Sequence, residues 1–380
     1  MSTTTTHIET EKQLVPELRF KEFEGDWNTK KLSDIYKINA GGDIDVNHVS
    51  QIKTEKYQYP IYANARKGKG FYAYSDIYKV EPNTVTIAGR GAHLGIAHAR
   101  DHRFYPIVRL LVLKPLNEED IHFSECAINR INLFIESTGV PQLTAPQISG
   151  YTISLPALPE QQKIASFLSA VDKKIQQLTK KKELLEQYKK GVMQQLFSGQ
   201  LRFKDENGKD YPDWEDMNLG DCLDYVQPTK FLVSSTEYND SYETPVLTAG
   251  KTFILGYTNE KENICNKYPL IIFDDFTTAT QYVDFPFKAK SSAMKLLIPK
   301  AGVVIKFMYE AMQNIKFEIG GHGRHWISIF SQLVMSIPSI EEQQKIATYL
   351  SSIDTKIEAV TNQITQNRTF KKGLLQKMFV

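Results

Sequence analysis

The sequence has few of the features that mark a secreted protein or a membrane protein. Its three cysteines, Cys126, Cys222 and Cys265, are scattered and fit neither a disulfide framework nor a zinc pattern, so we expect a protein of the reducing cytoplasm. No run of 18 apolar residues is present that could span a membrane, so we expect no membrane partner. The first residues, MSTTTTHIETEKQ, lack the apolar region of a secretory signal. We predict a disordered tail over residues 1–15.

Motifs for bound nucleotides and metals are also missing. No G-x-x-x-x-G-K-[ST] segment occurs. The glycine-rich segment 89–95 (GRGAHLG) follows a strand-like run, but the residues after it predict more strand, whereas a dinucleotide site needs a helix N-terminus there. The three histidines at 93, 98 and 102 share no helical or strand face, and the acidic pair at 274–275 is typical of a turn. We therefore expect no catalytic residue, metal or cofactor in this chain.

A large net charge of one sign is absent too, because the formal net charge is only +2. The charges are unevenly spread, however. Residues 66–103 carry seven Lys/Arg against three Asp/Glu, and residues 286–325 carry seven against two. Such clusters suit contacts with DNA phosphates, although an ordinary solvated face has the same composition. Residues 215–336 as a whole are net acidic, 11 basic to 14 acidic, which indicates one face for DNA and another for a protein.

What the sequence does contain is a long helix that begins near residue 157. Pro159 suits its first turn and Gly199 its C-terminal end, with no proline between, so the helix could reach roughly 60 Å. Its apolar residues alternate by four and three positions, the spacing of a single packing seam, and a helix of this length needs a partner along that seam. The predicted seam consists of Ile164, Leu168, Val171, Ile175 and Leu178.

The partner is a second copy of the same helix. Residues 337–380 align without a gap to residues 155–198, always 182 positions later, and 18 of the 44 pairs are identical. The run Glu-Gln-Gln-Lys-Ile-Ala occurs in both copies, so the chain contains an internal duplication. We expect the helices to pack antiparallel, with the first seam against the second in antiparallel order. The predicted second seam consists of Ile346, Leu350, Ile353, Ile357 and Val360.

The duplication extends over the segments that precede each helix. The triplet Leu-Arg-Phe occurs at 18–20 and again at 201–203, and Trp27 is answered by Trp214. Between these markers and the helices the identity nearly disappears, but the order of short β-branched runs persists, and we expect one helix at 124–137 and another at 303–314. The fold class predicted is α+β, with two globular mixed α/β domains, two long antiparallel coiled-coil helices and a pseudo-two-fold internal repeat.

This layout, two diverged globular units each followed by a helix that begins LP-x-L-P-E-Q-Q-K-I-A or its near copy, resembles the specificity subunits of type I restriction–modification enzymes. The resemblance covers about residues 14–380. It implies that each unit is a target-recognition domain for one half of a gapped, bipartite site in double-stranded DNA, with the helices as the ruler between halves. It divides the chain into recognition domain 1 (16–156), a central helix (157–200), recognition domain 2 (201–338) and a distal helix (339–380).

The resemblance also implies that the chemistry belongs to partners. Two methyltransferase subunits using S-adenosylmethionine, and restriction–translocase subunits using ATP and Mg, would dock on a chain that itself carries no cofactor. Two other interpretations stay open: a coiled-coil scaffold without nucleic acid, and an orphan two-site DNA adaptor outside restriction. Retention on specific DNA only when a methyltransferase is co-expressed would separate them.

The residues predicted to bind DNA come from the basic clusters and from the segments that the resemblance places along DNA, namely GRGAHLG, 139–147, TTATQY and GGHGRH. In the first unit they are Arg66, Lys67, Lys69, Arg90, His93, Arg100, Arg103, Gln142 and Thr144. In the second unit they are Lys251, Thr278, Thr280, Gln281, Tyr282, Lys288, Lys290, His322, Arg324 and His325.

Overall fold

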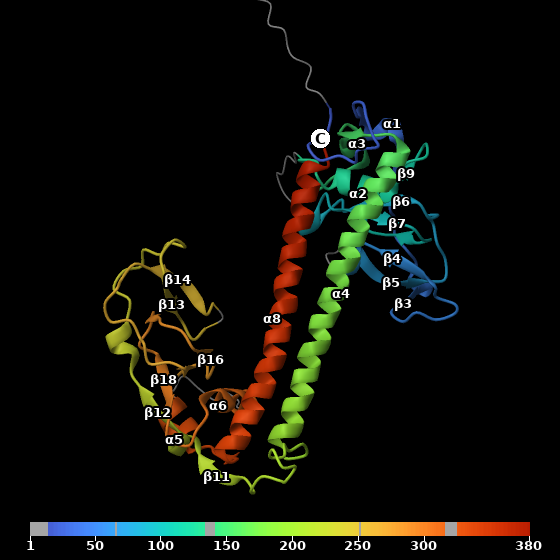
Figure 1. The fold of residues 1–380 in the computed structure, drawn as a ribbon. Coiled ribbons are helices and arrows are strands. Elements are labelled where there is room, and N and C mark those ends of the chain that lie inside the picture. Colours follow the sequence, from blue (N-terminus) through green and yellow to red (C-terminus); the bar gives the residue numbers. More distant parts are fainter. Residues whose placement is uncertain (1–13, 65–66, 134–140, 251, 316–324) are drawn as a thin grey trace, which may run out of the picture. The chain divides into compact units, whose positions relative to one another are not determined.

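The computed structural model describes residues 14–64, 67–133, 141–250, 252–315 and 325–380. It divides into two compact units, and each is described by itself (Figure 1). Unit 1 contains Met1–Leu178 with Gln363–Val380, and unit 2 contains Thr179–Asn362. Most of the predicted disordered tail, residues 1–13, lies outside the described residues. No described helix combines the length and apolar character needed to cross a membrane.

Unit 1 is built from three sheets. They are a two-stranded sheet β1-β10, a four-stranded sheet β2-β9-β6-β7 and a second four-stranded sheet β3-β5-β4-β8. All pairings are antiparallel except β4 with β8. The strands are β1 (Asn28–Lys31), β2 (Tyr36–Ala40), β3 (Val49–Ser50), β4 (Tyr59–Tyr62), β5 (Phe71–Ser75), β6 (Thr84–Ile87), β7 (Ala97–Arg100), β8 (Tyr105–Pro106), β9 (Leu111–Pro115) and β10 (Thr152–Leu155). The helices are α1 (Leu32–Ile35), α2 (Ile121–Ile128), α3 (Ala145–Ser149) and the first part of α4 (Leu158–Phe197), and the 3-10 turns are η1 (Val46–His48), η2 (Lys67–Gly70) and η3 (Gly91–His93).

Unit 2 repeats these sheets. Its two-stranded sheet is β11-β19, its four-stranded sheet is β12-β18-β15-β16, and a three-stranded sheet β14-β13-β17 corresponds to the second sheet of unit 1. The strands are β11 (Glu215–Asn218), β12 (Leu223–Val226), β13 (Thr244–Leu247), β14 (Ile254–Thr258), β15 (Leu270–Asp274), β16 (Thr280–Val283), β17 (Lys288–Ala289), β18 (Met294–Pro299) and β19 (Val334–Ile337). The helices are α5 (Leu219–Cys222), α6 (Ile305–Met312), α7 (His325–Ser328) and α8 (Ile340–Lys377), with 3-10 turns η4 (Pro228–Phe231) and η5 (Phe330–Gln332).

The predicted fold class is confirmed: two mixed α/β units form an internal repeat, and each is joined to long antiparallel helices. Helix α4 begins at Leu158, with Pro159 in its first turn, and ends at Phe197. Gly199 has φ of +72°, the left-handed conformation that ends a helix without strain only at glycine. Of the two shorter helices expected, α6 lies within 303–314 as predicted.

Helix α2 was predicted too late in the chain. It begins at Ile121 because the Asp120 carboxylate accepts hydrogen bonds from the backbone amides of His122 and Phe123, which is an N-cap. It ends at Ile128. Asn129 then hydrogen-bonds through its side chain to both backbone groups of Ala97 in β7, so a tertiary contact replaces the next turn of helix. Residues 134–137 of the predicted helix lie outside the described residues.

The helix seams were chosen correctly, but their pairing was not. All ten predicted seam residues are buried or half-buried. In unit 1 the start of α4 packs against the end of α8, where Ile164 and Leu168 share one core with Leu374, Met378 and Phe379. In unit 2 the end of α4 packs against the start of α8, in a core that contains Val192, Met193, Leu196, Ile346, Leu350 and Ile353. The first seam therefore packs on the last turns of α8, and the expected pairing of Ile164–Leu178 with Ile346–Val360 is wrong.

The register of the two helices follows from ion pairs that are also duplicated. In unit 1 the Lys371 ammonium lies 2.7 Å from both carboxylate oxygens of Asp172. In unit 2 the Lys189 ammonium lies 2.7 and 2.9 Å from the two oxygens of Asp354. An apolar seam repeats every heptad and is compatible with several registers, whereas a charge pair is satisfied in only one. The seam residues alone could not supply this information.

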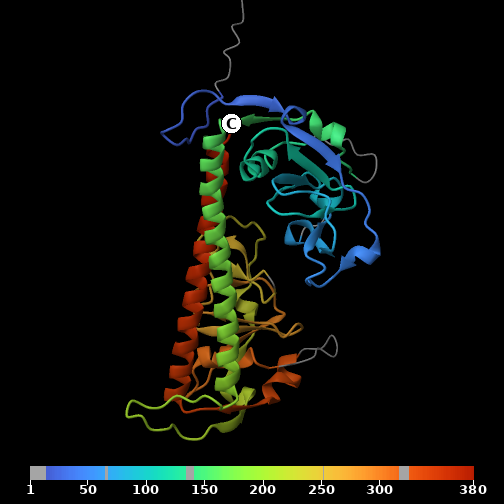
Figure 2. The same cartoon turned by 90° about the vertical axis from the view of Figure 1, so that its right-hand side faces the viewer.

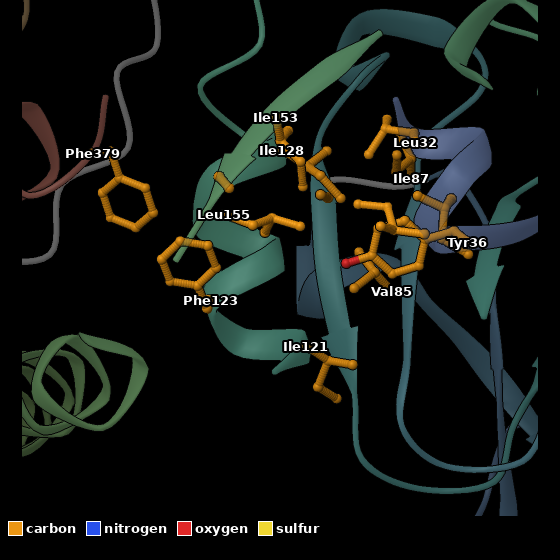
Figure 3. Close-up of a cluster of buried hydrophobic side chains, with 14 of the residues drawn as sticks. Leu32, Tyr36, Val85, Ile87, Ile121, Phe123, Ile128, Ile153, Leu155 and Phe379 are labelled. Atoms are coloured by element: carbon orange, nitrogen blue, oxygen red, sulfur yellow. The ribbon is translucent and has the colours of Figure 1, made fainter. Parts of the chain in front are cut away.

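The core of unit 1 joins its sheets to its helices. Phe123 of α2 stacks on Phe379 with ring centroids 5.0 Å apart, and Figure 3 shows the two rings facing each other near Leu155. The same core contains Leu32 and Ile87, both 0% exposed, from α1 and β6. In the second view the strands of unit 1 again lie beside the first turns of α4 (Figure 2). The end of α8 is therefore an integral part of the core of unit 1.

The duplicated Glu-Gln-Gln run clamps each globular unit onto its helix. In unit 1 Glu160, 2% exposed, accepts hydrogen bonds of 2.8 and 2.7 Å from Arg19 of the entry segment. In unit 2 Glu342, 0% exposed, accepts the corresponding bonds of 2.9 and 2.7 Å from Arg202. Two parallel N–H···O bonds to a buried carboxylate give a geometrically specific contact. This is the reason why Leu-Arg-Phe and Glu-Gln-Gln are repeated together.

The next residue of the run makes the second half of the clamp. Gln161 accepts a hydrogen bond from the Asp120 amide at the start of α2 and donates one to the Pro156 carbonyl. Gln343 does the same in unit 2, where it accepts from the Val304 amide at the start of α6 and donates to the Pro338 carbonyl. Both glutamines are nearly fully buried, so each satisfies backbone groups that would otherwise lack a partner.

Candidate nucleic-acid interface

The two segments of unit 1 that were predicted to bind DNA lie side by side. Arg90, next to turn η3, forms a β-bridge with Gln142, and its guanidinium donates to the Gln142 side-chain oxygen at 3.2 and 2.9 Å. The Leu143 amide donates to the Gly89 carbonyl at 2.9 Å. A Cβ at residue 89 would lie 2.8 Å from the Arg109 carbonyl oxygen, so this close approach requires glycine. GRGAHLG and the segment before α3 therefore form one polar surface, as a surface that contacts DNA requires.

Several predicted residues around this surface are accessible. Lys69 is exposed, and Arg90, His93, Gln142 and Thr144 are half-buried. Thr144 also begins α3, because its amide and hydroxyl both donate to the Gln147 side chain. Arg103 is 48% exposed and pairs with Glu81 at 2.9 Å, and the hydrogen bond from Arg103 lowers the pKa of Glu81. Lys67 lies in turn η2, and Arg66 lies outside the described residues.

Arg100, which was predicted to contact DNA, is buried inside unit 1. Its side chain is 2% exposed, its Nε donates to the Thr86 hydroxyl at 2.9 Å, and one terminal nitrogen donates to the Lys69 carbonyl at 2.6 Å. Its guanidinium also lies 3.6 Å from the ring centroid of Tyr62. Burial lowers the pKa of Arg100. The residue connects η2 to two strands, a structural role that does not favour the predicted contact with a phosphate.

In unit 2 the accessible candidates lie on β16 and the turn before it. Thr278 has φ of +59° and donates its amide to the Asp274 carbonyl, and the Asp274 side chain accepts two further amides, so the acidic pair begins a turn as predicted. Thr280, Gln281 and Tyr282 are half-buried on β16, an edge strand of its sheet. Lys290 is half-buried too, with its ammonium 5.7 Å from the Tyr238 ring.

Two further candidates of unit 2 are buried. Lys288 is 2% exposed, and its ammonium binds the Glu260 carboxylate and the Glu262 carbonyl. His325 is 4% exposed at the start of α7, where its amide donates to the Asp275 carbonyl. Both side chains are buried in this conformation, which does not favour a contact with DNA, and the two assignments stay predictions. Composition shows that a segment is basic, but it does not show which of its basic side chains are buried. Lys251, His322 and Arg324 lie outside the described residues.

The histidines and cysteines of the described residues form no metal site. No group of three or more His, Cys, Asp or Glu residues there could hold a metal. His98 pairs with Glu125 at 3.2 Å, and His102 bridges Asp101 and the Tyr62 hydroxyl, both at 2.8 Å. Burial raises the pKa of the Cys126 thiol to about 12, which makes it a poor nucleophile at neutral pH.

Sequence inspection missed the clamp residues Glu160, Gln161, Glu342 and Gln343 as positioning residues. The signal was present, since the Glu-Gln-Gln run and the entry arginines repeat at nearly the same separation. Their roles were hidden because the partners lie far apart in the chain, 141 residues for Arg19 and Glu160.

Comparison with known proteins gives one consistent result. The family model described as type I restriction modification DNA specificity domain matches twice, over residues 24–187 and 211–367. The specificity subunit of the type I restriction enzyme EcoR124I/EcoR124II of Escherichia coli is 45% identical over 163 residues, which are 40% of each chain. A putative type I specificity subunit of Mycoplasma pneumoniae is 33% identical over 40% of this chain and 45% of its own length. The matched segments thus span less than half of these relatives.

A solved structure shows the same fold over nearly the whole chain. The crystal structure of a type I restriction–modification S subunit from M. genitalium superposes with a TM-score of 0.71 at 16% identity, over 96% of this chain and 99% of its own. Both family matches coincide with the two repeats read from the sequence. The chain therefore belongs to the family of type I restriction–modification DNA specificity proteins.

Proposed function

We propose that the chain is the DNA-specificity subunit of a type I restriction–modification system and reads a gapped, bipartite site in double-stranded DNA. The observation that carries the proposal is the duplication: two units of the same topology, each clamped to its helix by the same Arg–Glu and Gln contacts, present different side chains on equivalent loops. A common frame with divergent loops is the arrangement expected of two readers of different half-sites.

In this proposal the polar surface around Arg90 and Gln142 contacts one half-site. The edge strand β16 and its preceding turn, with Thr280 and Tyr282, contact the other. Exposed Lys69 and Arg103 contribute phosphate contacts, which supply affinity for all sequences, while the amide and hydroxyl groups supply base discrimination. The length of the two helices sets the gap between half-sites.

The catalytic activities reside in partner subunits in this proposal. An adenine methyltransferase that uses S-adenosylmethionine, present in two copies, and a restriction–translocase that uses ATP and Mg dock on this chain. The family match supports the non-catalytic role, since the matching model describes a DNA specificity domain.

A domain exchange tests the proposal. Residues 28–154, from β1 to β10, are replaced by the same segment of another specificity subunit, and methylated adenines are mapped in cells that contain the methyltransferase. One half of the methylated site should change while the other half stays the same. A change in both halves would contradict modular reading, and unmethylated DNA with the parent chain would favour a scaffold without nucleic acid. Methyl transfer by the purified chain alone would refute the non-catalytic assignment.

A further inference from the structure

The small sheet of unit 1, β3-β5-β4-β8, has two chemically different faces. Ile61 of β4 and Ala73 of β5, both 0% exposed, are register partners and point into a local core with Ile107. The neighbouring register partners are Pro60 with Tyr74, and Tyr62 with Phe71. Because successive side chains of a strand alternate between faces, Pro60, Tyr62 and Tyr74 lie on the side away from that core. The β-bulge between Ile61 and Tyr62 pairs Phe71 with Tyr62, and both line the same pocket as Tyr74. This side of the sheet is aromatic.

Each unit has a pocket on this side of its small sheet. In unit 1 the pocket is about 500 Å³ and is lined by the rings of Tyr59, Tyr62, Phe71 and Tyr74, together with Lys53, His102 and Arg103. No carboxylate lines it. Phe71 is 37% exposed, and its ring lies 4.9 Å from that of Tyr74. Pockets of several hundred Å³ accept ligands of nucleotide size.

The pocket of unit 2 repeats this geometry with different chemistry. Pro245 and Tyr257 are register partners, as Pro60 and Tyr74 are in unit 1, and Ile254 stands opposite Leu247 where Phe71 stands opposite Tyr62. The loops before β8 and β17 place their residues equivalently, so that His102 and Arg103 correspond to Phe285 and Pro286. The unit 2 pocket, about 570 Å³, is lined by Glu243 but by no Lys, Arg or His.

We propose that the unit 1 pocket binds one unpaired nucleotide of a single-stranded nucleic acid, and that the equivalent unit 2 pocket does not. The base stacks on Phe71 and Tyr74, which offer π-faces that any base can use, and the phosphate lies against Lys53 and Arg103. Arg103 leaves its surface pair with Glu81 for this contact, at small cost because both side chains are about half exposed. This site is additional to the duplex reading proposed above and shares with it only the phosphate contact of Arg103.

Charge and ring content together select this ligand class. An apolar or basic occupant would suit the unit 2 pocket, where Ile254, Pro286 and Glu243 replace Phe71, Arg103 and Gln58. Of the two corresponding pockets, the one in unit 1 combines aromatic rings and cations without a lining carboxylate, which is the composition of surfaces that bind single strands by stacking and phosphate contact.

The test uses the full chain and a short fluorescent oligothymidine, with binding followed by anisotropy. Phe71→Ala and Tyr74→Ala should each weaken binding about tenfold. The matched variants Ile254→Ala and Tyr257→Ala, at the equivalent positions of unit 2, should leave it unchanged. Unchanged binding in both unit 1 variants, or equal losses from both pockets, would overturn the proposal.

Two further measurements distinguish loss of the pocket from misfolding of the variants and from loss of the duplex-binding surface. Duplex DNA containing the recognised site is titrated with the same Phe71 and Tyr74 variants. If they lose duplex and oligothymidine binding equally, the pocket is not a separate site. Loss of duplex binding by the unaltered chain would instead contradict the proposed function. Photocrosslinking of iodouracil-containing strands to the unaltered chain needs no variant. It should label the peptide that contains Phe71 and Tyr74. Labelling of the β13–β14 pocket instead would refute the assignment. Displacement of the bound strand by an acidic peptide, but not by nucleotides, would refute it too.

Discussion

Removing Arg202 should leave the buried carboxylate of Glu342 in unit 2 without its cationic partner. Glu342 is 0% exposed, and its oxygens accept bonds of 2.9 and 2.7 Å from Arg202 and one of 3.0 Å from the Trp214 indole. Breaking a buried ion pair from one side costs about 3–5 kcal/mol. Because the Arg202 side chain is 26% exposed, water screens part of the interaction, and we expect Arg202→Ala to lower the free energy of unfolding by roughly 2–4 kcal/mol.

The assay is urea unfolding followed by far-UV circular dichroism, with a check that the slope of the free energy with urea is unchanged. The double variant Arg202→Ala, Glu342→Leu removes both charges and keeps an apolar side chain of similar size. It should recover at least half of the loss, because no uncompensated carboxylate remains. If the double variant loses as much as the two single changes added together, the cost does not come from the stranded charge and the reasoning is refuted. Arg19→Ala, opposite the equally buried Glu160, should behave like Arg202→Ala.

Four other predictions follow from the contacts described above. Lys189→Ala should cost about 1–2 kcal/mol, because the buried Glu310 loses one of its two ammonium partners and keeps only Lys306 at 2.9 Å. Lys371→Ala, opposite the 47% exposed Asp172, should cost below ~1 kcal/mol in the same unfolding assay. The Lys288 hydrogen bond lowers the pKa of Glu260, so this carboxylate stabilises the fold above its unfolded pKa of about 4.3 and loses that effect as the pH falls through the lower folded value. Glu260→Gln should therefore flatten the loss of stability below about pH 4.3 in acid titrations. Arg90→Ala should weaken specific DNA binding, either for all sequences with a salt slope lower by about one or at one base pair by about 1–3 kcal/mol, while Arg100→Ala should lower the unfolding midpoint. A chain permuted to start near Lys204, with a linker from Val380 to Pro16, should fold with an unchanged midpoint, because the Leu18 amide already bonds the Lys377 carbonyl at 2.8 Å.

Much of the architecture could be predicted because it is encoded locally or by repetition. The alternating apolar spacing, the proline in the first turn and Gly199 beyond the last turn define α4 without reference to any other segment. The 182-residue offset then placed the second helix and the order of strands in the second unit. The run Thr84–Ile87 forms a strand because its β-branched residues favour the extended conformation and all four are buried.

The outcomes that depended on distant partners could not be read from the chain. Arg100 and Lys288 look like surface cations in a basic segment, but both are buried, and they pair with Tyr62 and Glu260 from other strands and loops. Helix α2 begins where Asp120 caps it, a choice settled together with its contact to Gln161 of α4.

The division between the two kinds of information is clearest in the long helices. Heptad spacing determined which face of each helix is buried, and all ten seam residues are at least half-buried. It did not determine which turn meets which, because an apolar seam fits at several registers. The two lysine–aspartate pairs between α4 and α8 are satisfied in one register, and they form only once the distant segments are packed together.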